Sequence, residues 1–349
     1  MAGLSEIARA AGVSVSTVSR VLNRRAGVNQ DTRRRVLTVL AEMPYTSRGI
    51  GALRRTGVIG LLVPELSNPV FPAFAEALET RAASAGYASM LCNTRSLSPQ
   101  GLGEEEYVRM LLTRGVEGMI FVSPDITNQG GAAEGEIGRV RGHYRRLVDD
   151  GVQLVFVNGG AASLNVPDVR VDEQLAGYTA TRHLLELGHR SIGFVSGPAY
   201  SLPSRLKHAG WAAAMEEAGH VSRPELVAHA PYGATGGASA LRELLARTEV
   251  TGVICSSDHM ALGVVAEARR QGLSVPADLS VVGFDDSTLA AHCGPPLTTL
   301  AQPIGEMAAA AVTELVERLE PESDSTADTF SRVFRPRLVV RESTAPPAR

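Results

Sequence analysis

The chain has 349 residues, of which 44% are hydrophobic and 20% charged, and its formal net charge is −3. This length suits two or three domains, and the hydrophobic content excludes global disorder. No apolar run approaches the ~18 residues of a membrane-spanning helix, the N-terminus lacks a secretory signal pattern, and three widely spaced cysteines match neither a disulfide framework nor a zinc motif. We therefore expect a soluble, cytoplasmic protein.

Charge is unevenly distributed along the chain. Residues 1–60 contain ten arginines and three acidic residues, so this segment carries +7 and the remainder −10. A basic head on an acidic body indicates binding of a polyanion by the head, although a solvated basic face explains the charge equally well. Lys207 is the only lysine, so the arginine content reflects a compositional bias and single arginines carry little weight.

Residues 1–45 predict three short helices. Apolar residues recur at helical spacing from Leu4 to Ala11, and Gly12 supplies the left-handed conformation that ends a helix. Ser14 is a natural N-cap for a second helix that runs to about Asn23, and Asn29 can cap a third. This pattern is typical of a DNA-binding helix-turn-helix. The alternative is a helical dimerisation bundle, which is disfavoured because the exposed face of the second helix lacks an apolar seam.

The stretch LSEIARAAGVSVSTVSRVLN (4–23) resembles the N-terminal signature of the LacI/GalR family of bacterial regulators, and VNQDTRRRVLTVLAEMPY (28–45) resembles the helix that follows it. The resemblance implies that the second helix enters the major groove, where Val15, Ser16 and Arg20 read bases. The planar fork of Arg20 suits the O6/N7 edge of guanine. The resemblance also implies phosphate contacts from short polar side chains. These are Ser5, Ser14, Thr17, Ser19 and Asn23.

Residues 46–56 are expected to form a hinge between the head and a core that begins at residue 57. In the family, a short helix here places a leucine in the minor groove and kinks the operator. Leu53 is the only candidate for that role in this chain. The segment is shorter than in relatives and contains Gly49 and Gly51, each of which costs about 1 kcal/mol of helix propensity relative to alanine. The hinge helix is therefore either less stable away from DNA or not formed as in relatives.

From residue 57 onward, short apolar runs alternate with helical segments, which predicts buried parallel sheet. Strands are expected at 57–64, 88–93, 118–124, 153–158, 191–197, 226–231, 251–257 and 279–286. Helices are expected at 69–85, 104–113, 138–149, 173–187, 204–218, 236–246 and 261–271. Two such series predict two lobes, with a ligand in the crevice at the carboxyl ends of the strands.

Several core segments also resemble landmarks of the LacI/GalR family, so the resemblance covers nearly the whole chain. They are LVPELSNPVFPAFAEAL, HLLELGHRSIGFVSGP, CSSDHMALG, SVVGFDDS and PPLTTLAQP. The resemblance implies an all-α helix-turn-helix head and an α/β, two-lobed, periplasmic-binding-protein-like core of two doubly wound parallel sheets, between which the chain crosses three times. The N-lobe would comprise residues 57–160 and 296–321, and the C-lobe residues 161–295 and 334–342. Residues 128–138 would form a surface insertion.

Candidate effector-binding residues lie at strand ends and on the helix that follows the first strand of the C-lobe. The resemblance favours Asp285 as a sugar ligand and gives Asp286 a structural role. Lys207 stands where the family commonly has an arginine; because an ammonium cannot replace a bidentate fork, the role falls to either Lys207 or Arg205. Asp258 is either a ligand or a helix cap. The other candidates are Leu66, Phe71, Ser123, Asn158, Ser257 and Gln302.

Two further features of the core are interpreted as structural. Trp211 is expected to pack in the core. His183 and His189 lie six residues apart, unlike the four-residue spacing of a metal-binding pair on a helix, so no metal site is expected. The sequence also lacks G-x-G-x-x-G, a phosphate loop, G-x-S-x-G and H-E-x-x-H. We therefore expect no catalytic residues and no cofactor.

The sequence favours a ligand-responsive transcriptional repressor. It would act as a nucleoid-associated homodimer on a pseudo-palindromic double-stranded operator, without a C-terminal tetramerising coil. PELSNPVFPAFAE and GPPLTTLAQPIGEM resemble actinobacterial regulators of maltose, maltodextrin and amylase genes, which implies an alpha-glucoside or malto-oligosaccharide effector. The alternatives are an activator, a regulator with a corepressor, a sugar receptor without DNA function, and a doubly wound oxidoreductase; the last lacks its glycine fingerprint.

Overall fold

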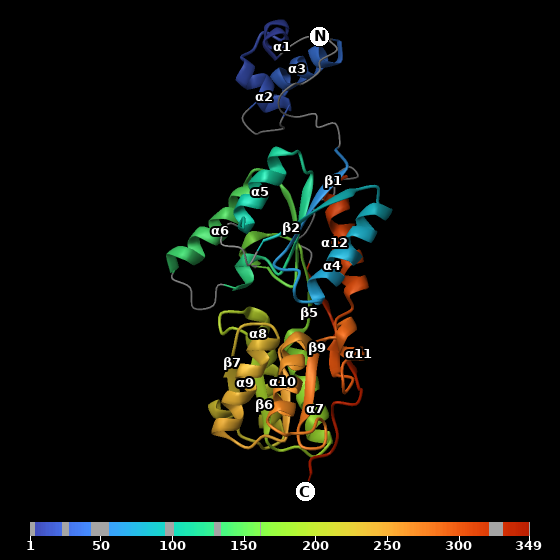
Figure 1. The fold of residues 1–349 in the computed structure, drawn as a ribbon. Coiled ribbons are helices and arrows are strands. Elements are labelled where there is room, and N and C mark those ends of the chain that lie inside the picture. The colour runs from blue at the N-terminus through green and yellow to red at the C-terminus, as the bar shows by residue number, and fades with distance from the viewer. Residues whose placement is uncertain are drawn as a thin grey trace. The chain divides into compact units, whose positions relative to one another are not determined.

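The computed structural model describes residues 4–22, 28–42, 56–94, 101–128, 134–160, 162–320 and 331–348. The chain divides into two compact units, Met1–Thr56 and Gly57–Arg349 (Figure 1). Apart from Thr56, the predicted hinge falls on residues outside the described part of the chain, as do Asn23 and Leu53. None of the described helices is long and apolar enough to cross a membrane.

The first unit contains the three predicted helices, α1 (Leu4–Ala10), α2 (Val15–Leu22) and α3 (Gln30–Glu42). The predicted caps are confirmed: the Ser14 hydroxyl accepts a hydrogen bond from the backbone N–H of Thr17 (3.1 Å), and Asn29 Oδ1 accepts one from Thr32 (2.8 Å). Gly12 ends the first helical segment at a φ of +64°. These caps satisfy backbone donors that a short helix leaves open. The small core consists of Ile7, Ala8, Ala11, Val18, Val21 and Val36.

The first sheet of the second unit has six parallel strands in the order β11-β5-β4-β3-β1-β2. Its strands are β1 (Val58–Val63), β2 (Ala88–Asn93), β3 (Gly118–Val122), β4 (Gln153–Val157), β5 (Asp168–Val171) and β11 (Ser331–Phe334). Its helices are α4 (Val70–Ser84), α5 (Glu104–Thr113), α6 (Glu134–Asp149) and α12 (Ile304–Leu319), with short 3-10 turns η1 (Asp125–Asn128) and η2 (Ala162–Leu164). Side chains alternate across the sheet. Ile120 and Val122 of β3 therefore join the cluster that includes α4 and α12, whereas Met119 and Phe121 join that of α5 and α6 (Figure 1).

The second sheet has the order β12-β10-β9-β8-β6-β7. Its strands are β6 (Ile192–Ser196), β7 (Val227–His229), β8 (Gly252–Cys255), β9 (Ser280–Asp285), β10 (Thr298–Ala301) and β12 (Arg337–Val339). Its helices are α7 (Glu173–Glu186), α8 (Leu202–Glu217), α9 (Ala234–Arg247), α10 (Asp258–Arg270) and α11 (Thr288–His292), with the turn η3 (Pro224–Leu226). One strand departs from the predicted parallel sheet, because β12 pairs antiparallel with β10. Arg335 and Pro336 alone separate β12 from β11, which belongs to the first sheet.

The chain crosses between the sheets three times: after β5, after β10 and after β11. The predicted lobe boundaries were displaced. Residues 168–171 lie in the first sheet rather than with 161–295, and residues 298–301 lie in the second sheet rather than with 57–160. Both are four-residue strands with little apolar signal, and each crossing follows the end of such a strand. The segment predicted as an insertion, 128–138, contains the first turn of α6, which begins at Glu134.

Two helix pairs of the second unit cross with backbone against backbone. A Cβ built at Gly177 of α7 would overlap the carbonyl oxygen of Lys207 in α8, and one at Gly210 of α8 would overlap that of Gln174 in α7. Helices α9 and α10 show the same reciprocal arrangement at Gly237 and Gly263. Glycine is therefore required at these crossings, and the first of them sets the rotation of α8.

Substitution of Gly210 by alanine is expected to destabilise the protein by about 1–3 kcal/mol or more, because the added methyl meets backbone atoms that cannot rotate away. The control is Gly138→Ala on α6, where a Cβ meets no atom within 4 Å. That change is expected to stabilise by up to about 1 kcal/mol through helix propensity. Urea unfolding of both variants tests this, and equal midpoints would contradict the close crossing.

Candidate functional site

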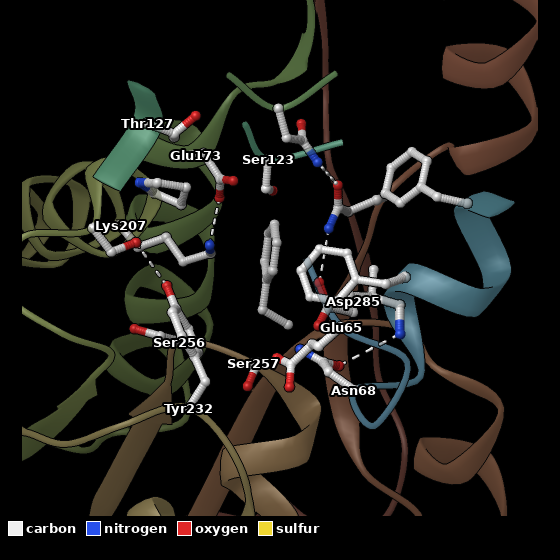
Figure 2. A pocket seen from close by; sticks show the side chains of 18 of the residues that line it. Glu65, Asn68, Ser123, Thr127, Glu173, Lys207, Tyr232, Ser256, Ser257 and Asp285 are labelled. Carbon is white, nitrogen blue, oxygen red and sulfur yellow. Dashed lines mark hydrogen bonds and ion pairs between the residues drawn. The ribbon is translucent and has the colours of Figure 1, made fainter. Parts of the chain in front are cut away.

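A partly open cavity of about 650 Å³ lies between the carboxyl ends of the strands of the two sheets (Figure 2). Parallel sheets bring such strand ends together, so residues distant in sequence meet here. Its lining comprises Glu65, Asn68, Val70, Phe71, Phe74, Ser123, Thr127, Asn128, Asn158, Glu173, Ser201, Pro203, Lys207, Tyr232, Ser256, Ser257, Phe284, Asp285 and Gln302.

Three lining residues have backbone conformations that side chains rarely adopt. Ser123, Asn158 and Asp285 have φ angles of 50°, 51° and 122°, and each lies at or just after the end of a strand. Such conformations cost of order 1–3 kcal/mol each and cluster at ligand-binding sites, where surrounding structure maintains them. All three strained residues are therefore among those that the sequence analysis predicted because they lie at strand ends.

A chain of hydrogen bonds runs across the cavity from one sheet to the other (Figure 2). Asn158 Nδ2 donates to Gln302 Oε1 (2.8 Å), and Gln302 Nε2 donates to Asp285 Oδ1 (2.7 Å). Asn158 Oδ1 accepts a hydrogen bond from the backbone N–H of Val171 (3.1 Å), which precedes the first crossing. Gln302 begins the second crossing, so the chain of bonds fixes two of the three connections between the sheets.

The carboxyl group of Asp285 is buried within this network. Burial raises its pKa well above the ordinary value, and the neighbouring negative charge of Asp258 raises it further, whereas Lys207 opposes the rise. A buried carboxylate with few water contacts gains most from new hydrogen-bond donors. The hydroxyl groups of a ligand are such donors.

Lys207 of α8 and Glu173, the first residue of α7, form a buried ion pair beside this network. Their charged atoms are 2.6 Å apart, and their side chains are 5% and 8% exposed. Lys207 Nζ also lies 3.8 Å from the centroid of the Phe284 ring. Burial raises the pKa of Glu173, and the Lys207 ammonium opposes that rise. The cation at the cavity is therefore Lys207, whereas Arg205 is exposed and absent from the lining.

Aromatic side chains supply much of the remaining wall. Phe71 and Phe74 come from α4, and Phe284 from β9. Tyr232 follows β7, and its hydroxyl lies 3.0 Å from that of Ser201 and 2.6 Å from that of Ser204, which hold its ring in place. The cavity thus combines ring faces with amide and carboxyl groups.

The structure places seven of the ten predicted effector residues in the cavity: Phe71, Ser123, Asn158, Lys207, Ser257, Asp285 and Gln302. Leu66, Arg205 and Asp258 are not among the lining residues. Leu66 is 47% exposed, because it lies in the loop beyond β1.

Asp258 binds neighbouring segments of the core instead of lining the cavity. Its Oδ1 accepts a hydrogen bond from the Thr299 hydroxyl (2.6 Å), and its Oδ2 accepts one from the backbone N–H of Ser287 (2.7 Å). Burial raises the pKa of Asp258 to about 6. The N-cap of α10 is Ser257, whose hydroxyl accepts a hydrogen bond from Met260. Asp258 therefore ties the start of α10 to β10 and to the segment after β9.

Asp286, Trp211 and His189 do not line the cavity and bind other parts of the core. Asp286 pairs with Arg341 at 2.5 Å, and Trp211 is fully buried with its Nε1 donating to the carbonyl of Ile192 (3.2 Å). His189 is buried between hydroxyl groups and a backbone carbonyl, and burial lowers its pKa. Within the described ranges, no three His, Cys, Asp or Glu side chains are grouped so that they could hold a metal ion.

Sequence reasoning missed several lining residues: Glu65, Asn68, Thr127, Glu173, Ser201, Tyr232, Ser256 and Phe284. Glu65, Tyr232 and Ser256 follow strand ends, and the rule that selected Asn158 could have found them. Glu173 begins a helix, and no sequence signal distinguishes it from a solvated first-turn acid.

Seven of the nine predicted DNA-binding residues, all but Asn23 and Leu53, lie on α1, α2 and the turn between them. Val15 is 43% exposed, and Thr17 is half-buried with its hydroxyl 2.8 Å from that of Ser14. The side chains of Ser5, Ser16, Ser19 and Arg20 lie outside the described part of the chain. Their helical positions follow from the backbone alone.

Comparisons with known proteins agree with both units. Residues 3–47 match the model "Bacterial regulatory proteins, lacI family", and residues 181–344 match "Periplasmic binding protein-like domain". An uncharacterised HTH-type transcriptional regulator from the aml 5′ region of Streptomyces limosus is 43% identical over 98% of this chain and 94% of its own length. The HTH-type transcriptional regulator MalR of Streptomyces coelicolor is 40% identical over 98% of this chain and 96% of its own.

This chain belongs to the LacI family of bacterial transcriptional regulators. Its fold is similar to that of the transcriptional regulator CelR in a complex with cellobiose, with a TM-score of 0.71 and 29% identity over 98% of this chain and 100% of that one. As a member of this family the protein is a DNA-binding regulator of transcription, with an N-terminal helix-turn-helix and a two-lobed core.

Proposed function

We propose that this regulator is a transcriptional repressor whose affinity for its operator is set by an alpha-glucoside or malto-oligosaccharide bound in the cavity between the two sheets. The network of Asn158, Gln302 and Asp285 between aromatic walls carries this proposal, because sugars need paired hydrogen bonds and an apolar ring contact. The cellobiose complex of CelR and the similarity to MalR also support it.

The charges around the cavity favour an uncharged sugar. Among the described lining residues, Glu65, Glu173 and Asp285 are acidic, and the one cation, Lys207, is paired with Glu173. A sugar phosphate would have to break that ion pair or lie beside unpaired carboxylates, at a large cost in a site of low dielectric. Glucose 6-phosphate is therefore expected to bind more weakly than the neutral sugars.

The sugar would act by favouring one arrangement of the two sheets. A ligand that bonds to Asn158 on one side and Asp285 on the other stabilises the arrangement of the sheets in which both side chains face it. Gln302 bonds to both of these residues, so the same arrangement also fixes the crossing segments. In a homodimer on a pseudo-palindromic operator, this changes the spacing of the two heads or the folding of hinge helices carrying Leu53. Operator and effector binding would then be coupled by typically 1–3 kcal/mol. We propose no catalytic activity and a cytoplasmic, nucleoid-associated location.

The test is to select operator duplexes from a library of palindromic sites with the purified full-length protein. The selected duplex is then titrated with maltose, maltotriose, cellobiose and glucose 6-phosphate. Release of the duplex by a maltose-series sugar is expected. Tight binding that no sugar changes would contradict sugar control, and tighter binding with sugar would identify a corepressor. A monomer bound to a half-site, seen by sedimentation, would contradict the dimer.

On the selected operator, Arg20→Ala is expected to weaken binding by about 5- to 150-fold and to relax the preference for guanine at one position, because a bidentate contact to guanine is worth about 1–3 kcal/mol. Arg34→Ala, at an exposed position of α3, is the matched control for loss of one positive charge. It is expected to weaken all sequences alike. Equal losses for Arg20→Ala on guanine-containing and substituted sites would show that Arg20 contacts phosphate instead.

A further inference from the structure

A second, partly open cavity of about 1020 Å³ adjoins the first beside the crossing from β5 to α7. Its lining comprises Thr127, Asn158, Gly159, Gly160, Arg170, Val171, Asp172, Glu173, Gln174, Leu202, Pro203, Leu206 and Val333. Four of these residues, Thr127, Asn158, Glu173 and Pro203, also line the first cavity. The two cavities therefore share one wall, formed by side chains from η1, the end of β4 and the starts of α7 and α8.

A buried polar group in this shared wall has no hydrogen-bond partner among the residues that the structure describes. Thr127 is 3% exposed, and its side-chain oxygen makes no hydrogen bond within the described part of the chain. A Cβ at position 159 would overlap this oxygen and the ring of Pro124, so Gly159 keeps the wall thin at this point. Buried hydroxyl groups in proteins are normally hydrogen-bonded, so this unpaired hydroxyl beside both cavities could pair with a ligand hydroxyl that reaches the wall.

The second cavity has the mixed chemistry that a sugar ring requires. Val171, Leu202 and Leu206 offer apolar surface for the C–H face of the ring. Nη1 of Arg170 donates a hydrogen bond to Oδ2 of Asp168 (3.1 Å). Half of the Arg170 side chain stays exposed, so its other N–H groups can donate to a ligand. Gln174 adds an amide group at the start of α7.

We propose that the regulator recognises linear oligosaccharides longer than a disaccharide, whose further sugar units pass the Thr127 wall and occupy the second cavity. This inference rests on the proposed function, because it assigns the chain length of the same effector. Described aromatic side chains line only the first cavity, so each further unit adds less affinity than the first two.

The test is calorimetric titration of the full-length protein with maltose, maltotriose and maltotetraose. The parent protein is expected to bind maltotetraose at least about fivefold more tightly than maltose, the gain from one additional net hydrogen bond. Leu206→Trp, which fills the second cavity, is expected to remove this gain and leave the affinity for maltose unchanged. The control is Leu112→Trp on α5, a partly exposed leucine that lines neither cavity.

A second variant probes the shared wall. Thr127→Val keeps the shape of the side chain and removes the hydroxyl, so it is expected to reduce the gain with chain length while thermal unfolding stays close to that of the parent. Equal affinity for all three sugars, or equal losses for maltose and maltotetraose in Leu206→Trp, would overturn the inference and leave the proposed function standing. Failure of every sugar to bind the parent protein would overturn both.

Discussion

Asp285→Ala is expected to lower the affinity for the effector sugar by about 10- to 150-fold while operator binding stays within about twofold of the parent. A hydrogen bond to a charged group contributes about 1.5–3 kcal/mol, and the substitution removes the carboxylate and releases Gln302, its partner at 2.7 Å. Calorimetry with the sugar measures the loss. Titration of the protein–operator complex measures whether the sugar still releases DNA.

Stability separates this effect from general damage. Burial raises the pKa of Asp285, so the ionised carboxylate costs folding free energy, and this cost grows as the pH rises above the ordinary carboxyl range. Asp285→Asn is therefore expected to lose sugar response at neutral pH with equal or higher thermal stability. Asp286→Asn is the control, because Asp286 pairs with Arg341 outside the cavity lining. A normal sugar response in Asp285→Ala, or equal losses at both positions, would refute the assignment.

Lys207→Met is expected to destabilise the core by about 3–5 kcal/mol at neutral pH, because it leaves Glu173 as an unpaired charge in a buried site. Without the ammonium that opposes the burial effect, the pKa of Glu173 rises further, and the side chain takes up a proton as the pH falls. A raised folded-state pKa means that stability is lost as the pH rises above the unfolded value of about 4.3. The destabilisation is therefore expected to be smaller at pH 5 than at pH 8, as measured by urea unfolding.

The double variant Lys207→Met/Glu173→Gln tests the origin of that loss. Removing both charges is expected to recover most of the stability, since a buried ion pair and a neutral pair of similar size differ little in energy. Arg182→Ala at the exposed Arg182–Glu186 pair is the surface control and is expected to change the stability little, because exposed ion pairs contribute weakly. A loss below about 1 kcal/mol in Lys207→Met would show that the pair is hydrated, as a surface pair is.

The architecture of the core could be predicted because its strands are short apolar runs between helices of regular length. Three strands, β5, β10 and β11, were not predicted from that pattern. DVRV of β5 and SRVF of β11 have four positions and only two apolar residues each, so neither stands out from a loop. Their pairing in register, Asp168 with Ser331 through Val171 with Phe334, depends on segments more than 150 residues apart. The displaced lobe boundaries follow directly from these two strands and β10.

Site residues could be predicted where they lie at strand ends. The carboxyl ends of parallel strands share one edge of a sheet, so the positions of Ser123, Asn158 and Asp285 at the cavity do not depend on the conformation of the loops. Sequence reasoning could not choose between Arg205 and Lys207, because both belong to α8. Two residues apart, their side chains point about 200° from each other around the helix, and only the rotation of α8 decides which faces inward.

The sequence by itself determined the family, the three capped helices of the head and the strand-end residues of the cavity, because each depends on local spacing or on the geometry of any parallel sheet. The tertiary structure alone decided that Lys207 is buried against Glu173, that Asp258 supports the framework, and that a second cavity adjoins the first. Each of these depends on how helices are rotated and packed. At α7 and α8 that packing is set by two glycines whose contacts lie on different helices, so no local pattern reveals it.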